Sequence, residues 1–380
     1  MSTKQRFICR KFSLLLYCML LFQVSGAQND FGKVDNWLKN NLEELGGRAV
    51  LVIYKDGKVV YTHSENGLNK RQKMVAKFVA KRQGKDQSEM TEDLEPSSRL
   101  RIASCSKWLS AALVMTFIDE GKLNPDDSVG KYLPVMTANG KGNIKIWQCL
   151  SHLTGIKAGT LKESLQEVKE IKSMEEAIEK IAGQPMEGEP GKTFHYGNVG
   201  LQIAGAVIEK ISGKSFETLF AERIAQPCDM KNTDFGKGPV ALPAGGAFST
   251  ANDYLNFLVM ILNDGKFNGK QVLSKSSVIK MQQNYAKGAK IISSPAEAGS
   301  WGYGFGEWVM DPTPTLSIPI AIEREGARSV AVTSPGLFGS FPWVDNQKKY
   351  AGFLFCFNLK SKGRNERYKE LKQLVDEALK

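Results

Sequence analysis

A serine and a lysine three residues apart, Ser104 and Lys107, have the spacing in this chain that most directly suggests chemistry. On a helix, such side chains share one face with about 5–6 Å between their Cβ atoms, so the amine can hydrogen-bond the hydroxyl and help to take its proton. If Ser104 opens the helix, its own N–H is unpaired, and the helix dipole favours negative charge there. The pair therefore predicts a serine nucleophile with half of an oxyanion hole.

The surroundings of Ser104 distinguish it from two other serines with the same spacing to a lysine. Ser128 is followed by Gly130 and is expected in a loop, and Ser277 is expected on a surface helix. Ser104 instead follows a short apolar run and precedes the strongly apolar stretch 108–118. This pattern predicts a buried helix over 104–120, which ends at Gly121, where a C-terminal glycine is typical.

Other catalytic chemistries lack the residues they need. The three histidines, His63, His152 and His195, show no metal-ligand spacing. The sequence contains no phosphate-binding loop, no dinucleotide fingerprint and no G-x-S-x-G nucleophile motif. We therefore expect neither a metal nor an organic cofactor.

The elements that must position the pair follow from the periodicity of apolar residues. A helix is expected over 31–46, and two strands over 49–54 and 58–62 form a hairpin around Lys55-Asp56-Gly57. After the hairpin we expect helices, then strands, and then a final helix whose apolar stripe extends over 368–379. The helices are expected at 146–152, 173–183, 199–212, 215–226 and 251–264. The strands are expected at 302–310, 318–322, 329–333 and 350–358. This order predicts an α/β (α+β) fold, in which both ends of the chain share one antiparallel sheet flanked by helices, with a helical region inserted between them.

The first 27 residues have the pattern of a secretory signal peptide. A basic start precedes the apolar run 12–22, and small residues follow at 25–27. The run is shorter than the roughly 20 residues that a spanning helix needs, so we expect export to the periplasm or medium and no stable membrane span. The remaining cysteines, Cys105, Cys149, Cys228 and Cys356, are isolated in sequence. They are expected to be buried as small hydrophobic residues. The alternative is that two of them form one disulfide bond.

The net charge of +11 does not by itself indicate a nucleic-acid partner, because no zinc-finger or RNP-type motif accompanies it. The segment 66–98 is polar and charged, and within it Met74, Val75, Phe78 and Val79 line one side of a basic, helix-like stretch. A solvated surface insertion is the favoured interpretation. Contact with a membrane surface or a partner is the alternative.

Several longer segments resemble the serine β-lactamase-like hydrolases, the superfamily of class C β-lactamases, D-amino-acid peptidases, penicillin-binding proteins and esterases. The similar segments follow the family's order and are found at 101–112, 119–134, 144–156 and 245–254. The resemblance extends over essentially all of the chain after the leader. It implies one hydrolase domain over 28–380, with an α/β region at 28–100 and 265–380, a helical region at 101–264, and the site between them.

The family's second motif, Y-x-N, is matched by Tyr196-Gly197-Asn198. By this resemblance Tyr196 is a catalytic residue, since a tyrosine beside an ammonium loses its proton more easily, can act as a base and can return the proton to the leaving group. Asn198 could then hold a substrate carbonyl. The family does not require His195, which we expect to pack or orient, and His152 falls in a segment that resembles a structural turn.

The third motif departs from the pattern of many relatives, which carry Lys-Thr-Gly or His-x-Gly on an edge strand. The matching stretch here is Ser334-Pro335-Gly336-Leu337, so a serine replaces the cation. By position, Ser334 and Gly336 are expected to meet the substrate, and the Leu337 N–H is the second oxyanion donor. Together with the following F-G and P-W-V-D, this stretch resembles an esterase-like branch; the alternative is a plain Gly/Pro turn.

The sequence therefore predicts a serine hydrolase that cleaves an ester or amide through an acyl-enzyme on Ser104, with Lys107 and Tyr196 sharing the work of the base. A small ester, amide or peptide-like molecule is the expected substrate, and an esterase is preferred. β-Lactamase or D-amino-acid peptidase and penicillin-binding activity is the first alternative. A non-catalytic binding protein on the same fold is the second. The acyl acceptor and the oligomeric state remain open.

Overall fold

The computed structural model describes residues 29–83, 86–159, 171–310, 329–359 and 362–380. The predicted leader at 1–27 and the predicted strand at 318–322 lie outside the described residues.

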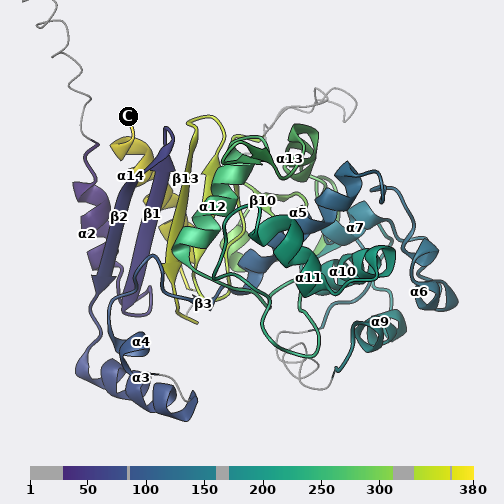
Figure 1. The fold of residues 1–380 in the computed structure, drawn as a ribbon, viewed down its shortest axis with the longest axis horizontal. Helices are drawn as coiled ribbons and strands as arrows, with labels where there is room; N and C mark the ends of the chain where they lie inside the picture. Colours follow the sequence, from purple (N-terminus) through teal and green to yellow (C-terminus); the bar gives the residue numbers. More distant parts are fainter. Residues whose placement is uncertain (1–28, 84–85, 160–170, 311–328, 360–361) are drawn as a thin grey trace, which may run out of the picture.

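A seven-stranded antiparallel sheet has the order β2-β1-β13-β12-β11-β10-β9 (Figure 1). Its strands are β1 (Arg48–Lys55), β2 (Lys58–Asn66), β9 (Gly302–Tyr303), β10 (Trp308–Val309), β11 (Ala331–Thr333), β12 (Phe341–Asp345) and β13 (Tyr350–Cys356). Strand β1 pairs with β13, which confirms that the two ends of the chain join in one sheet. The strand expected over 302–310 is instead two short strands, because the chain turns back between them, with Gly306 at φ +76°.

The predicted hairpin is confirmed, and both of its strands are longer than expected. Asp56 and Gly57 have φ values of +50° and +82°. Two successive residues with positive φ match the type I′ turn, whose twist suits two antiparallel strands.

Side chains alternate between the two faces of the sheet and so create two cores. In β1, Ala49, Leu51 and Ile53 pack in one core with α2 (Gly32–Asn40) and α14 (Arg364–Ala378). Val50 and Val52 pack in the other core with α12 (Ala251–Leu262) and α5 (Ser106–Asp119). Figure 1 shows α2 and α14 at the outer edge and α12 and α5 on the inner side. This arrangement follows from the two-residue period of a strand.

Helix α2 ends at Asn40, earlier than the predicted end at residue 46. Leu42 and Leu45 are still buried, but they lie in a turn that leads to Gly46 and Gly47, both with positive φ. The apolar spacing therefore predicted the burial of Leu42 and Leu45 correctly, but the predicted end of the helix was wrong.

The inserted helical region lies between the first two strands and the last five. The predicted helices are confirmed as α7 (Ile146–Leu150), α9 (Met174–Gly183), α10 (Val199–Ser212), α11 (Phe216–Phe220), which continues as a π-helical turn over Ala221–Ala225, and α12. Shorter elements complete the described chain: α6 (Pro134–Ala138), α13 (Lys275–Met281), and the small strands β3 (Leu100–Arg101), β4 (Thr193–His195), β5 (Phe248–Ser249), β6 (Lys266–Phe267), β7 (Lys270–Gln271) and β8 (Lys290–Ser293), with 3₁₀ turns at Val129–Lys131 and Ala296–Ala298.

Helix α5 is the centre of this region. Every residue from Ser106 to Phe117 is buried, as expected for a helix that is apolar on nearly all sides.

All four described cysteines are free and buried, which confirms their expected role as small hydrophobic residues.

The segment 66–98 contains α3 (Lys70–Gln83) and α4 (Ser88–Thr91), and its Leu94 is buried in the core that α5 and α12 share. Figure 1 shows α3 projecting from the end of the sheet, away from the helical region. The exposure of α3 agrees with a position at the surface, and the choice between a solvated insertion and contact with a membrane or partner stays a prediction.

Candidate active site

Ser104 lies in a tight 3₁₀ turn, Ala103–Cys105, that leads directly into α5. Ala103 has a φ of +44°, a left-handed conformation that is uncommon for a residue with a side chain. Strained backbone of this kind persists only where neighbouring contacts hold it. Here Ser106 Oγ donates to the Ala103 carbonyl at 2.6 Å and accepts from the Ala247 N–H at 3.0 Å. The turn leaves the Ser104 side chain half-buried at the start of the central helix.

The segment around residues 243–254 supports this turn. Strand β3 pairs with β5, and the Ile102 N–H donates to the Ala247 carbonyl at 3.0 Å. The Tyr254 hydroxyl donates to the Cys105 carbonyl at 2.8 Å. Sequence reasoning noted the family-like segment 245–254 but did not predict that it holds the serine turn.

Lys107 is buried next to Ser104, and its amine hydrogen-bonds three neutral oxygen atoms. Lys107 Nζ lies 3.2 Å from Ser104 Oγ, 2.7 Å from the Ala244 carbonyl oxygen and 3.4 Å from Asn198 Oδ1. Burial lowers the pKa of Lys107 to about 7, because the charged form loses its hydration. A large fraction of the amine is therefore neutral at pH 7, and it can accept the proton of the Ser104 hydroxyl.

Tyr196 follows β4 and brings its ring to Lys107, with 4.8 Å between Lys107 Nζ and the ring centroid. Its hydroxyl also hydrogen-bonds the Ser104 side chain. Burial raises the pKa of Tyr196 well above its usual value of 10, and the hydrogen bond with Ser104 offsets only part of that increase.

These two pKa shifts bear on the predicted sharing of the base between Lys107 and Tyr196. At neutral pH Tyr196 keeps its proton, because the desolvation of its buried hydroxyl raises its pKa. The directions of the two pKa shifts favour Lys107 as the base and Tyr196 as a proton donor. The sharing predicted from the sequence stays a prediction.

A cluster of aromatic side chains holds the Tyr196 ring in place. Trp308 stacks on it with 5.2 Å between ring centroids, and His152 meets it at 4.8 Å and 60°. His152 Nε2 hydrogen-bonds the Tyr303 hydroxyl at 3.0 Å, and burial lowers the pKa of His152, so its ring is neutral. Sequence reasoning missed Trp308 and Tyr303, which belong to strands far along the chain from Tyr196.

His195 contributes differently from its neighbour. Its Nδ1 pairs with the carboxylate of Glu187, and its backbone N–H donates to the His152 carbonyl at 3.1 Å. These contacts agree with the predicted packing or orienting role.

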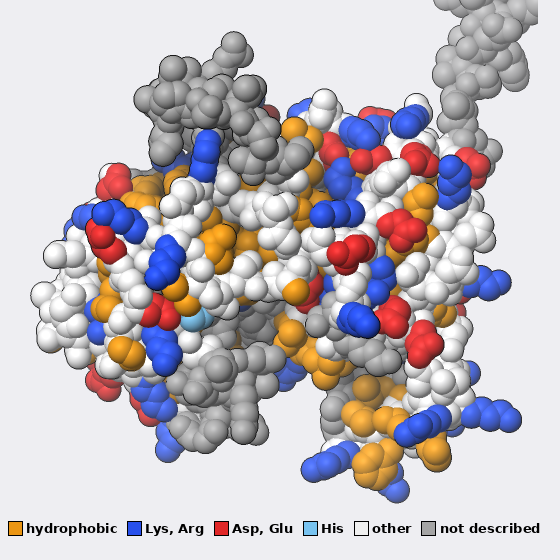
Figure 2. Space-filling model, turned by 180° about the vertical axis from the view of Figure 1, so that it is seen from behind, with side chains coloured by type: hydrophobic (Ala, Val, Ile, Leu, Met, Phe, Trp, Pro, Cys, Tyr) orange, Lys and Arg blue, Asp and Glu red, His pale blue; other side chains and the backbone are white. Residues whose placement is uncertain are grey.

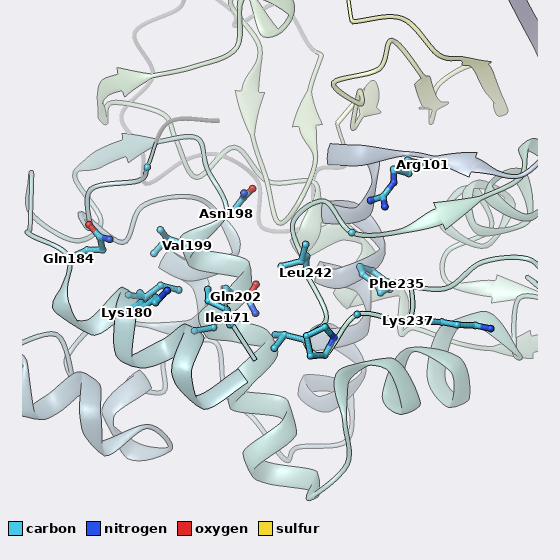
Figure 3. Close-up of a pocket in the computed structure, with 18 of the residues that line it drawn as sticks. Arg101, Ile171, Lys180, Gln184, Asn198, Val199, Gln202, Phe235, Lys237 and Leu242 are labelled. Atoms are coloured by element: carbon cyan, nitrogen blue, oxygen red, sulfur yellow. The ribbon is translucent and has the colours of Figure 1, made fainter. Parts of the chain in front are cut away.

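Asn198 is the residue before α10 and connects the reacting groups to a cavity of about 340 Å³. Figure 3 shows Asn198 at the upper edge of this pocket, with Val199, Leu242 and Phe235 below it supplying apolar surface. Lys180 also lines it. Among the reacting groups and their contacts, Asn198 lines this pocket, whereas Ser104, Lys107 and Tyr196 do not. Besides its apolar surface the lining includes Arg101, Lys157 and Lys237.

The structure gives Ser334 a different role from the predicted contact with substrate. Its side chain is buried, with a relative exposure of 2%, and Oγ donates to the carbonyls of Ser104 (3.2 Å) and Gly306 (3.1 Å). The hydroxyl is thus used internally and ties the end of β11 to the serine turn. Ser334 is a positioning residue, and a lysine in its place would be buried beside α5.

Gly336 and Leu337 lie in the turn after β11, close to the serine. A β-carbon at Gly336 would lie 2.4 Å from the Ile102 carbonyl oxygen, so only glycine allows this close approach. The turn is closed by bonds from the Gly336 N–H to the Ser340 carbonyl and from the Gly339 N–H to the Gly336 carbonyl. Within the described residues no group accepts from the Leu337 N–H, which leaves it available for the predicted oxyanion contact.

A buried arginine, Arg364, anchors the same turn. Its Nη1 donates to the Leu337 carbonyl at 2.7 Å and pairs with Glu297 at 3.2 Å. The first residue of the final helix therefore orients a peptide group beside the site, a role that no local pattern indicated.

In the part of the chain that the structure describes, no group of three or more His, Cys, Asp or Glu side chains could hold a metal ion.

The lowered pKa of Lys107 predicts a pH dependence. We expect the rate at which a fluorophosphonate probe labels Ser104 to rise with pH through about 7 and then level off. Below this pH the ammonium form predominates and cannot take the serine proton, whereas above it the neutral amine is present. Labelling rates between about pH 5 and pH 9 measure this dependence, and a flat profile would contradict Lys107 as the base.

Comparisons with known proteins agree with this arrangement. The family model described as Beta-lactamase matches residues 35–377. An uncharacterised protein of Mycobacterium tuberculosis is 24% identical over 303 residues, which are 66% of this chain and 73% of that protein. A Bacteroides dorei structure with the provisional description of β-lactamase gives a TM-score of 0.74 at 24% identity, covering 92% of this chain and 99% of its own. The structure of a family VIII carboxylesterase gives a TM-score of 0.67 at 18% identity, and the match covers 90% of this chain and 97% of the carboxylesterase. At these identities the structural likenesses show a shared fold.

Proposed function

The chain belongs to the Beta-lactamase family, and from this premise we propose that residues 28–380 form one serine hydrolase domain that cleaves small esters through an acyl-enzyme on Ser104. The observation that carries the proposal is the buried Lys107 amine, which hydrogen-bonds Ser104 Oγ and has a pKa of about 7. A neutral amine in contact with a serine hydroxyl is a base placed on a nucleophile. A structural ion pair would instead keep the lysine charged.

The reaction steps follow from these positions. Neutral Lys107 takes the proton of Ser104 Oγ as this oxygen bonds to the ester carbonyl carbon. The Ser104 and Leu337 N–H groups stabilise the resulting oxyanion. The ester C–O bond then breaks, and the leaving alkoxide takes a proton from Tyr196, which recovers one from the Lys107 ammonium. In the second half, water loses a proton to Lys107 as its oxygen bonds to the acyl carbon. The bond between the acyl carbon and Ser104 Oγ then breaks, Oγ takes that proton back from the Lys107 ammonium, and the acid leaves.

Two features favour an ester over a β-lactam or a C-terminal peptide. Such substrates bring a carboxylate to the end of β11, where a charge-assisted hydrogen bond would be about twice as strong as a neutral one. Ser334 offers no charge there, and its hydroxyl is turned to backbone carbonyls. An uncharged ester has no carboxylate, so the missing cation does not weaken its binding. Its leaving alkoxide also needs protonation less than the nitrogen of an amide does.

The pocket beside Asn198 supports a substrate with one apolar arm (Figure 3). Its volume of about 340 Å³ lies at the lower end of the range for small-molecule sites. We place one side of the ester here, with the carbonyl carbon at Ser104.

Esters are expected to exceed β-lactams in kcat/KM by at least about tenfold, which corresponds to roughly 1.4 kcal/mol of transition-state preference. The test compares p-nitrophenyl butyrate with nitrocefin on the same preparation. The variant Ser104→Ala serves as the control, since both activities must disappear with it if they share one site.

Two outcomes would lead to other functions. Efficient nitrocefin hydrolysis with negligible esterase activity would favour the β-lactamase alternative. A protein that is folded, hydrolyses neither substrate and is not labelled by a fluorophosphonate at Ser104 would be a binding protein on the same fold.

We also propose that residues 1–27 direct export. The support is their order of basic, apolar and small residues. Fractionation of producing cells, with the N-terminus of the extracytoplasmic protein sequenced, tests this directly.

A further inference from the structure

Helix α3 is a well-defined helix that takes no part in the site described above. Its start is fixed by reciprocal bonds, in which Asn69 Oδ1 accepts from the Gln72 N–H and Gln72 Oε1 accepts from the Asn69 N–H, both at 2.9 Å. This is the geometry of a capping box. On one side of the helix Ala80 is fully buried and Ala76 and Val79 are half-buried, and α3 contacts the short helix α4. The side of α3 that carries Ala80 is therefore the side turned toward the protein.

The opposite side of α3 presents large apolar side chains to solvent. Met74 and Phe78 are each 67% exposed, and Val75 is 54% exposed. Residues 74, 75 and 78 share one face of a helix, about half a turn away from the buried side. Figure 2 shows a hydrophobic patch with blue side chains beside it at the end of the molecule that carries α3. The exposure is thus a continuous stripe rather than scattered single residues.

The remaining outward positions of α3 are positively charged. The helix contains no acidic residue, and its cations are Lys70, Arg71, Lys73, Lys77, Lys81 and Arg82. On the helix they lie at both ends of the apolar stripe and along one edge of it. An apolar stripe bordered by lysine and arginine is the pattern of helices that lie in the interface of a membrane.

The size and charge of this face favour a lipid surface over other partners. A protein interface of standard size buries about 800 Å² on each side, far more than three side chains of one helix provide. A nucleic acid would pair with the cations but would leave Met74 and Phe78 in water. An anionic bilayer satisfies both groups, since headgroup charges attract each nearby lysine or arginine and the acyl boundary accepts the apolar side chains. In the described residues no helix is long and apolar enough to cross a bilayer, so the contact would lie at the surface.

We propose that α3 binds the surface of membranes that contain anionic phospholipids, with Met74, Val75 and Phe78 inserted between the headgroups. This surface is separate from the reacting groups, and the inference does not depend on which bond the site cleaves.

The test is co-sedimentation of the mature protein with large vesicles. One set contains phosphatidylcholine alone, and the other contains about one quarter phosphatidylglycerol. We expect binding to the anionic vesicles only. The double variant Met74→Ser/Phe78→Ser should weaken that binding at least about tenfold, because burial of each CH₂ contributes roughly 0.8 kcal/mol. The variant Lys73→Gln/Lys77→Gln should weaken it several-fold, because each cation near the surface adds about 1 kcal/mol.

A matched control replaces exposed apolar residues elsewhere on the surface. Ile291 and Leu359 are 64% and 65% exposed, and Ile291→Ser/Leu359→Ser should bind vesicles as the parent does. The substituted α3 side chains are exposed, so the fold should be unchanged. Circular dichroism and thermal unfolding check this without reference to enzymatic activity.

Four results would overturn the proposal. They are the absence of vesicle binding, equal binding to uncharged vesicles, an equal loss in the control variant, and binding that falls with salt but is indifferent to Met74 and Phe78. A parent protein that is dimeric in solution, with a monomeric Met74→Ser/Phe78→Ser variant, would instead assign the stripe to self-association.

Discussion

The variant Ser104→Ala is expected to reduce kcat/KM for the best ester by at least about four orders of magnitude, the scale seen when other hydrolases lose their nucleophile. Without Oγ no acyl-enzyme can form, and Lys107 has no hydroxyl to deprotonate. The fold should persist, because Ser104 is half-buried and alanine adds no volume to the turn. Steady-state hydrolysis and mass spectrometry of the protein after fluorophosphonate treatment measure the loss.

A second serine with the same spacing to a lysine supplies the control. Ser128 precedes Lys131 by three residues, but its hydroxyl accepts a hydrogen bond from Lys145 Nζ at 2.9 Å. Neither Ser128 nor Lys145 belongs to the reacting groups. Ser128→Ala should stay within about twofold of the parent, as expected for a surface substitution of small effect. If Ser104→Ala keeps more than about a tenth of the parent activity, the assigned nucleophile is incorrect.

The second large effect concerns the two groups that move the proton. Lys107→Met and Tyr196→Phe should each lower the rate by roughly 10²–10⁴, the range for positioned acid and base groups. Methionine and phenylalanine keep most of the buried volume, so packing against Trp308 and α5 is retained. The effects of the two changes should be less than additive, because both groups act on one proton path.

The pH profile separates the two roles. Tyr196→Phe should keep the rise in rate near pH 7, because Lys107 remains as the base with its lowered pKa. Lys107→Met should remove that rise. Fully additive losses in the double variant, or a rise near pH 7 that survives in Lys107→Met, would show that the two groups act independently or that another group is the base.

Much of the fold follows from local patterns in the sequence. The hairpin of β1 and β2 could be predicted because Asp56-Gly57 suits a turn with two positive φ values, and the helices because apolar residues recur at helical spacing. Helix length was less predictable. Leu42 and Leu45 continue the apolar spacing of α2 although the helix ends at Asn40, since burial alone does not require helical backbone.

The candidate site divides in the same way. The contact between Ser104 and Lys107 could be expected from the sequence, since three residues of one helical turn separate them. Tyr196, Asn198 and the turn at Gly336 came from resemblance to a family, because no local rule brings residues so far apart in the chain together. Trp308, Tyr303 and Arg364 were missed for that reason: each acts on the site only through tertiary contacts.

The sequence by itself determined the order of the elements, the joining of both chain ends in one sheet, and a serine and a lysine on adjacent positions of one helical face. Only the tertiary structure decided their protonation states and orientations. The pKa of Lys107 is lowered because α5 lies inside the molecule, and the pKa of Tyr196 is raised because an aromatic cluster surrounds it. Ser334 has its own backbone partners and so turns away from substrate. Hydration is lost only when distant segments pack together, and for that reason no pattern within a single segment could show which group accepts the proton.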